Sequence, residues 1–222
     1  MRGLVDLADQ AARQSDQGPA SAVYNQAALL ASDLGLPDLA RTLCHRHAAA
    51  YLHACPLPAT SAMRGLEPVV NLARLHIRAG RPDTGHRHLT ALYRAVDAGT
   101  AAELDGIAVP ADLTVTDEDR REVRGWLWRV LITDGTRTLT IQGRRRDALA
   151  HLERHRGVGA RMLDGRQVAV LAALTAGDTD HAQALLTDTV PGEPWERDVT
   201  ACLTVLCHRT AAGRPTRTRP TR

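Results

Sequence analysis

The stretch GLPDLA at residues 35–40 decides the fold, and it recurs as GRPDTG at residues 80–85. In both, proline stands two residues after the first glycine and aspartate three residues after it. Glycine adopts the left-handed conformation that ends a helix, whereas proline and aspartate suit the first turn of the next one. Looser versions are GRRRDA at 143–148 and GDTDHA at 177–182. The sequence therefore predicts four helix–turn–helix joints.

The residues around these four glycines share one register. The fifth residue after each glycine is small, the ninth is cysteine or leucine, and the residue seven positions before is small or medium-sized. These positions hold Ala40, Gly85, Ala148 and Ala182, then Cys44, Leu89, Leu152 and Leu186, and finally Ala28, Ala73, Thr136 and Val170. Small residues at a repeated position allow helices to approach closely, so each glycine is predicted to join an antiparallel pair.

Apolar residues recur at spacings of three and four along most of the chain, and strand-like alternation is nearly absent. The sequence predicts an all-α protein of about nine to ten helices, arranged as stacked antiparallel hairpins. The most clearly bounded helices are expected at about 19–34, at 37–55, from 116 to about 142, and from near 195 to before 213. A first helix is expected around Leu4, Leu7, Ala8 and Ala11.

Residues 97–116, DAGTAAELDGIAVPADLTVT, interrupt this pattern. They lose the helical period and include short extended pieces around 107–109. Such a long irregular segment is usually either functional or disordered. We predict one helical domain over 1–212 with this irregular insertion, followed by a disordered Arg/Pro/Thr tail at 213–222.

The joints resemble the tetratricopeptide repeat, a helical hairpin whose turn glycine is followed five residues later by a small residue and then by an apolar one. The glycines here are 45, 63 and 34 residues apart, whereas that family repeats every ~34 residues. Only Tyr24 fills the family's early aromatic position. The resemblance therefore implies a degenerate α-solenoid with a concave binding face.

Composition excludes several enzyme classes. The chain has no lysine, so Walker-A loops, kinase-type lysines and Schiff-base chemistry lack their required residue. Abundant alanine and arginine without lysine or phenylalanine indicate GC-rich coding of the actinobacterial type. Of the formal charge of +3, four positive charges lie in residues 214–222, which leaves −1 for residues 1–213. The folded part is therefore not expected to bind nucleic acid.

No targeting or membrane segment is expected. Asp6 and Asp9 interrupt the apolar run that a signal peptide needs, and no segment reaches the ~18 apolar residues of a membrane span. A cytoplasmic location with reduced cysteines is predicted.

One helix face carries Cys44, His47, Tyr51 and Cys55, for which core packing is favoured over zinc binding. No catalytic residue, metal or cofactor is predicted.

Arginine clusters are the remaining polar feature. Arg144, Arg145 and Arg146 stand at a predicted turn, and residues 120, 121 and 124 supply a second cluster near the start of a helix. A solvated surface is favoured for both, and anchoring of a carboxylate or phosphate is the alternative.

We predict a non-enzymatic adaptor that binds a protein or peptide segment on the first helix of each hairpin. Two alternatives stay open: a small-ligand-binding regulatory or sensor module, and an accessory enzyme of a specialised-metabolite pathway. That enzyme would use acids and histidines near the insertion, with acids such as Glu103, Asp105, Asp117 and Glu118. The last helix, with Cys202, Leu203, Val205 and Leu206, is a candidate homodimer surface. The expected adaptor contacts are Tyr24, Asn25, Asn71, Arg74, Arg78, Arg124, Trp128 and Arg129.

Overall fold

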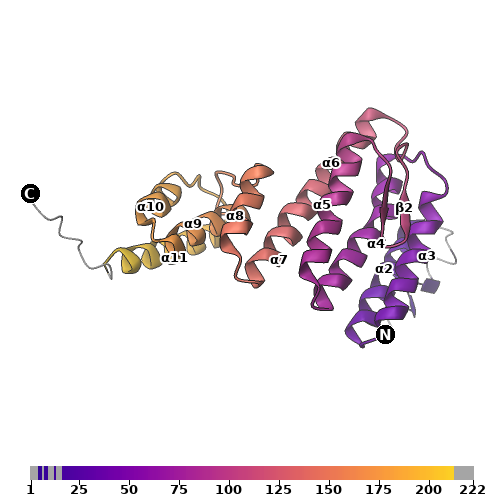
Figure 1. Ribbon diagram of the computed structural model, residues 1–222, viewed down its shortest axis with the longest axis horizontal. Coiled ribbons are helices and arrows are strands. Elements are labelled where there is room, and N and C mark those ends of the chain that lie inside the picture. Colours follow the sequence, from indigo (N-terminus) through magenta and orange to yellow (C-terminus); the bar gives the residue numbers. More distant parts are fainter. Residues whose placement is uncertain (1–4, 7, 10–12, 14–16, 213–222) are drawn as a thin grey trace, which may run out of the picture. The chain divides into compact units, whose positions relative to one another are not determined.

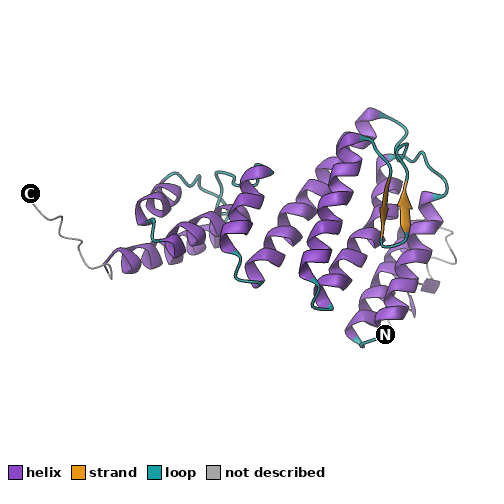
Figure 2. Cartoon of the chain, in the orientation of Figure 1, coloured by secondary structure: helices purple, strands orange, loops and turns teal. Residues whose placement is uncertain are grey.

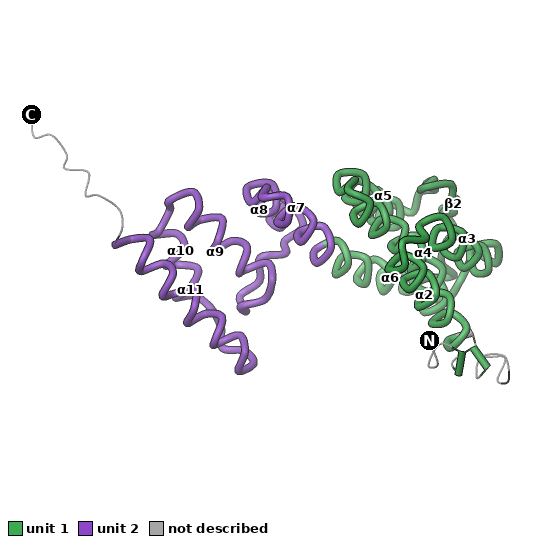
Figure 3. The backbone as a smooth tube through the Cα atoms, turned by 90° about the horizontal axis from the view of Figure 1, so that it is seen from below, with its two compact units in different colours: residues 1–131 green, residues 132–222 purple. Residues whose placement is uncertain are grey.

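The computed structural model describes residues 5, 6, 8, 9, 13 and 17–212 (Figure 1). These residues are mostly helical (Figure 2), which confirms the all-α class. The expected first helix falls largely, and the expected tail entirely, outside the described residues. The chain divides into two compact units, Met1–Leu131 and Ile132–Arg222 (Figure 3). That residues 1–212 form one helical domain stays a prediction.

Unit 1 consists of helices packed in chain order, with a small β-hairpin. Each helix from α2 to α5 contacts the next, α5 contacts α6, and α4 also contacts α2 and α6. The two strands contact α5 and α3. The elements are α2 (Gln17–Asp33), α3 (Pro37–Leu52), α4 (Ala59–Arg78), α5 (Pro82–Ala98), β1 (Ala102–Leu104), β2 (Ile107–Val109) and α6 (Asp117–Val130).

Unit 2 is built from shorter helices and one long final helix. A π-helical segment, η1 (Leu131–Gly135), follows α6 and leads directly into α7, so the helix expected from 116 to about 142 is present as three successive segments. Helices α7 to α10 each contact the next, and α11 contacts α9 and α10. The remaining elements are α7 (Thr136–Ile141), α8 (Arg145–Arg154), α9 (Asp164–Ala176), α10 (Thr179–Thr187) and α11 (Pro194–Ala212).

The four predicted joints are confirmed. Gly35, Gly80, Gly143 and Gly177 all have a φ between 72° and 78°, which is the left-handed conformation that glycine adopts without strain. All twelve positions of the shared register are buried. At Gly85 an added Cβ would lie 2.5 Å from the backbone oxygen of Ala73. The small residue after the turn is thus what lets α5 approach α4.

The insertion at 97–116 folds into an antiparallel hairpin in which Leu104 pairs with Ile107. Asp105 and Gly106 form its tip, with φ values of 54° and 79°. Positive φ at both central residues is the signature of a type I′ turn, for which Asp-Gly is a preferred sequence. Leu57 and Thr114 form a further parallel bridge, which ties the end of the insertion to the α3–α4 connection.

Helix α6 begins with a capping box. The Thr116 hydroxyl accepts a hydrogen bond from the Asp119 backbone N–H at 3.0 Å, and Asp119 Oδ2 accepts one from the Thr116 backbone N–H at 3.1 Å. Asp119 Oδ1 also accepts a hydrogen bond from the backbone N–H of Ala59 at 2.9 Å. One carboxylate therefore caps α6 and fixes the start of α4.

Each unit has its own hydrophobic cluster. In unit 1 the cluster is centred on α4, where 11 of 20 residues are buried. In unit 2 a smaller cluster joins α9, α10 and α11 around Val170, Leu186 and Leu203. Among the described residues, no helix combines the length and the apolar character needed to cross a membrane.

Candidate functional site

A row of hydrogen-bonded polar side chains joins α2 to α4. Asn25 Nδ2 donates to Glu67 Oε2, and Asn25 Oδ1 accepts from Asn71 Nδ2 at 3.1 Å. Asn71 Oδ1 in turn accepts from an Arg74 N–H at 3.1 Å. Because every link has a defined donor and acceptor, the row fixes which way both amides point. We call Asn25, Glu67, Asn71 and Arg74 the α2–α4 polar row.

Arg78 lies one helical turn beyond this row, at the end of α4. Its guanidinium donates to the Ser32 hydroxyl at 3.0 Å and to the Asp33 carboxylate at 2.7 Å. Both charged side chains are about half exposed, so the ion pair is well solvated and contributes only about 0–1 kcal/mol. Such a pair can exchange its internal carboxylate for one on a partner at little cost.

The expected contact residues on α6 are not gathered in the same way. Arg124 is exposed and pairs with Asp97 of α5 at 3.2 Å. Trp128 is half-buried and Arg129 is exposed. Arg129 follows Arg124 by five residues, which places the two about 140° apart around the helix. Arg124 and Arg129 therefore cannot face the same ligand.

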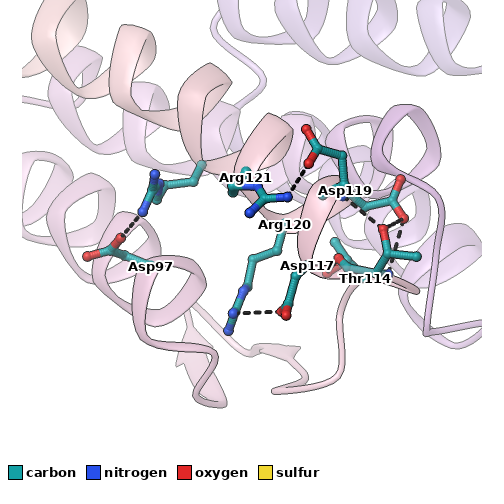
Figure 4. Close-up of polar contacts among 9 residues, drawn as sticks. Asp97, Thr114, Asp117, Asp119, Arg120 and Arg121 are labelled. Carbon is teal, nitrogen blue, oxygen red and sulfur yellow. Dashed lines mark hydrogen bonds and ion pairs between the residues drawn. The ribbon is translucent and has the colours of Figure 1, made fainter.

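The arginines at the start of α6 are already paired within the chain (Figure 4). Arg120 pairs with Asp117 at 2.8 Å, and Arg121 pairs with Glu118. With Arg124 on Asp97, each guanidinium of this cluster has a carboxylate of its own. These internal pairs favour a solvated helix surface over a phosphate or carboxylate site. They also show that Asp117 and Glu118 are engaged with arginines.

Tyr24 faces the α2–α3 seam. Its ring stacks on His47 of α3, with ring centroids 5.4 Å apart and planes inclined by 21°. His47 also makes a 2.9 Å hydrogen bond to the Ser21 hydroxyl and an edge contact to Tyr51. Burial lowers the pKa of His47 from 6.5 to about 4, so the ring is neutral at pH 7. Tyr24 is thus half-buried and packs on a buried, neutral histidine.

A second polar cluster lies where the tip of the β-hairpin meets three helices. Asp105 accepts a hydrogen bond from Arg41 of α3 at 2.5 Å, and its other oxygen lies 3.3 Å from His76 Nε2 on α4. The His76 ring makes an edge contact with His88 of α5, with centroids 5.0 Å apart. Because Asp105 is only 13% exposed, its charge is compensated mainly by these neighbours. We call Arg41, His76, His88 and Asp105 the hairpin cluster.

The protonation states of the hairpin cluster follow from its contacts. Arg81 Nε donates to His76 Nδ1 at 3.2 Å, which leaves the ring proton of a neutral His76 on Nε2, facing Asp105. Burial alone would raise the pKa of Asp105, but the hydrogen bond and charge of Arg41, aided by His76 and His88, lower it. The pKa of His88 is lowered, chiefly by burial. Asp105 is therefore ionised and His88 neutral at pH 7.

The thiol nearest to this cluster is not a nucleophile at neutral pH. Burial raises the pKa of Cys44 to about 11, against a smaller opposing effect of Arg41. A protonated thiol reacts slowly because the thiolate is the nucleophilic form. Of the four acids expected near the insertion, only Asp105 lies among histidines, whereas Glu103 is exposed on β1. The cluster is thus better suited to holding the hairpin than to covalent catalysis.

The stripe of metal-competent residues on α3 lies mostly in the core. Cys44, His47 and Tyr51 are buried and Cys55 is partly buried. Among the residues that the structure describes, no three histidine, cysteine or acidic side chains come together as a metal site. The positions of these side chains agree with core packing.

The remaining arginine cluster borders a hollow in unit 2. Gly143, Arg144, Arg145 and Arg146 lie on one side of this hollow, and Ala172 and Thr175 of α9 lie on the other. Arg144 pairs with Asp147 at 2.6 Å, and all three arginines are exposed. An open, water-filled surface binds anions weakly.

Comparison with family models, with curated proteins and with solved structures finds no match in any of the three.

Of the expected contact residues, Asn25, Asn71 and Arg74 are joined by hydrogen bonds between α2 and α4, and Arg78 bonds to the end of α2. Sequence reasoning missed Glu67, because a contact 42 residues away along the chain leaves no local signal. It also missed the role of Arg41 and His76. The Asp105–Gly106 dipeptide between short apolar runs was a readable hairpin signal. Its helix partners, however, depend on tertiary packing.

Proposed function

We propose that the protein is a non-enzymatic adaptor that binds an acidic peptide or protein segment along α2 and α4. The proposal includes a tetratricopeptide-like stack of hairpins, whose first helices α2, α4 and α6 form the binding face. The contacts of α4 with both α2 and α6 support this arrangement. The β-hairpin contacts α3 and α5, the second helices of these hairpins.

The α2–α4 polar row is the observation that carries the proposal. A carboxamide has two N–H groups, and among the described contacts Asn25 uses one of them. Asn25 is half-buried, so its second N–H can reach the backbone carbonyl of an extended peptide. Holding the amide in place before binding reduces the entropy lost on association. Arg74 and Arg78 supply positive charge beside it.

Binding of a displayed peptide library tests the proposal. We expect a random library, panned on the full chain, to yield peptides rich in Asp and Glu. Arg74→Glu/Arg78→Glu should weaken those peptides at least tenfold, whereas Arg145→Glu/Arg146→Glu in unit 2 is the matched control and should not. Asp33→Asn removes the internal competitor of Arg78 and should tighten binding. Failure to enrich any peptide, or equal binding by the α4 double variant, would contradict the proposal.

A small-ligand or enzymatic role stays a second candidate, and the hairpin cluster would be its place. The buried atoms His76 Nε2 and Asp105 Oδ2 have no hydrogen-bond partner within the described part of the chain, although they lie 3.3 Å apart. A polar ligand could satisfy both. In a thermal-shift screen against nucleotides, amino acids and metals, a rise in Tm that Asp105→Asn abolishes would favour this role.

A further inference from the structure

The long final helix α11 is covered on one side only. Of its 19 residues, three are buried: Glu196, Leu203 and Cys207. Large apolar side chains elsewhere on the helix are open to solvent, with Trp195 48% exposed, Val205 53% and Leu206 43%. Exposed apolar side chains that cluster on one surface mark an interaction site more often than single ones do.

The exposed side chains of α11 form a regular stripe. Asp198, Cys202, Val205 and Arg209 follow one another at spacings of four, three and four residues, which places them on one face of a helix. At 100° per residue this face lies opposite Leu203 and Cys207, which anchor the helix to its own unit. All four stripe residues are exposed.

The two ends of the stripe carry opposite charges. Asp198 stands near the start of α11 and Arg209 near its end, and neither has an ion-pair partner within the described residues. Suppose that a second copy of the helix lies antiparallel to the first. With the two-fold axis level with the midpoint between Leu203 and Thr204, Asp198 of each copy then faces Arg209 of the other. A parallel pair would instead place like charges opposite each other, which is unfavourable.

We propose that the outer face of α11 is a homodimer interface, formed by antiparallel pairing of α11 with α11 of a second copy. Two ion pairs then flank a central apolar contact, in which Cys202 lies opposite Val205 of the second copy. Such an interface is self-complementary, as a two-fold symmetric dimer requires.

Sedimentation velocity of the full chain from about 1 to 200 µM, under reducing conditions, tests the proposal. One helix pair is at the small end of specific interfaces, so dimerisation is expected within this micromolar range. Asp198→Arg and Arg209→Asp should each weaken the dimer at least tenfold, because each places like charges together. The double variant Asp198→Arg/Arg209→Asp should restore it. Glu122→Arg, an exposed charge reversal on α6, is the control and should change nothing.

Three results would overturn the proposal. They are a wild-type chain that is monomeric at 200 µM, single variants that dimerise as well as wild type, and a folded double variant that stays monomeric. Maleimide labelling of Cys202 gives a second readout that needs no variant. Its rate should fall as wild-type concentration rises, because the thiol becomes covered, and a constant rate would count against this interface. A different protein bound to this face of a monomeric chain would likewise refute the homodimer.

Discussion

Helices α4 and α11 have nearly equal length but opposite surroundings. They are similarly apolar overall, yet α4 has 11 buried residues and α11 has three. Helix α4 contacts α2, α3, α5 and α6, whereas α11 contacts α9 and α10. The comparison teaches that burial in this protein depends on how many neighbours a helix has, and not on its composition.

The largest expected difference between the two helices is in stability. Leu66→Ala on α4 should lower the free energy of unfolding by about 2–5 kcal/mol, because Leu66 is fully buried and its removal leaves a cavity. Leu206→Ala on α11 should change the stability of the monomer by less than about 0.5 kcal/mol. Urea unfolding at low micromolar concentration measures both. Equal losses of unfolding free energy in the two variants would show that Leu206 is as well packed within the monomer as Leu66.

Acid should destabilise unit 1 already between pH 6.5 and 4. The pKa of buried His47 is about 4 in the folded chain, below its ordinary 6.5, so the unfolded chain takes up the proton first. Stability therefore falls as the pH drops from 6.5 to 4, by at most about 3 kcal/mol for this residue. Arg161 lowers the pKa of Glu196 in unit 2, so the stabilisation from that pair is lost only below about pH 4.5.

Variants can assign this acid sensitivity. Tryptophan fluorescence of Trp195→Phe reports unit 1 alone, because the other two tryptophans lie in α6. His47→Gln should reduce the loss of stability between pH 6.5 and 4, whereas His53→Gln, at an exposed position, should not. An unchanged slope in His47→Gln would mean that other groups, such as His88, dominate.

A smaller effect is expected where the β-hairpin meets the helices of unit 1. Asp105→Asn removes the charge that pairs with Arg41 and should weaken hairpin docking by about 1–3 kcal/mol. A glutamate-specific protease can monitor this at Glu103, which is exposed on β1. We expect cleavage roughly 5 to 150 times faster when docking weakens by this amount. Asp112→Asn, in the same segment but exposed, serves as the control. Equal cleavage rates of Asp105→Asn and wild type would show that the hairpin cluster does not hold the β-hairpin against the helices.

The smallest effect is expected at the ion pairs that begin α6. Arg121→Ala breaks an exposed pair with Glu118 and should change the free energy of unfolding by less than about 0.5 kcal/mol. The same urea titration measures it. A loss above 1 kcal/mol would show that this arginine cluster has a structural role that the solvated pairs do not explain.

Much of the fold could be read from local signals in the sequence. The glycine turns and the prolines at Pro37 and Pro82 act within a few residues, and each is present as expected. The division into two units could not be read, because it depends on how contacts are distributed between distant segments.

The candidate site could be predicted only in part. Asn25, Asn71 and Arg74 were placed by helix spacing, but the row they form also needs Glu67. Tyr24 fits the repeat pattern by residue type, yet its ring packs on His47. Helix phase does not show which neighbour a side chain will meet, so such partners need coordinates.

Hydrogen exchange of the full chain, followed helix by helix at several protein concentrations, tests the contrast between α4 and α11 most directly. The account predicts that α4 amides are strongly protected at every concentration. The amides of α11 should exchange faster at about 1 µM and become more protected toward 200 µM, as a second copy covers the helix. Equal protection of α11 and α4 at about 1 µM, unchanged by concentration, would contradict the account.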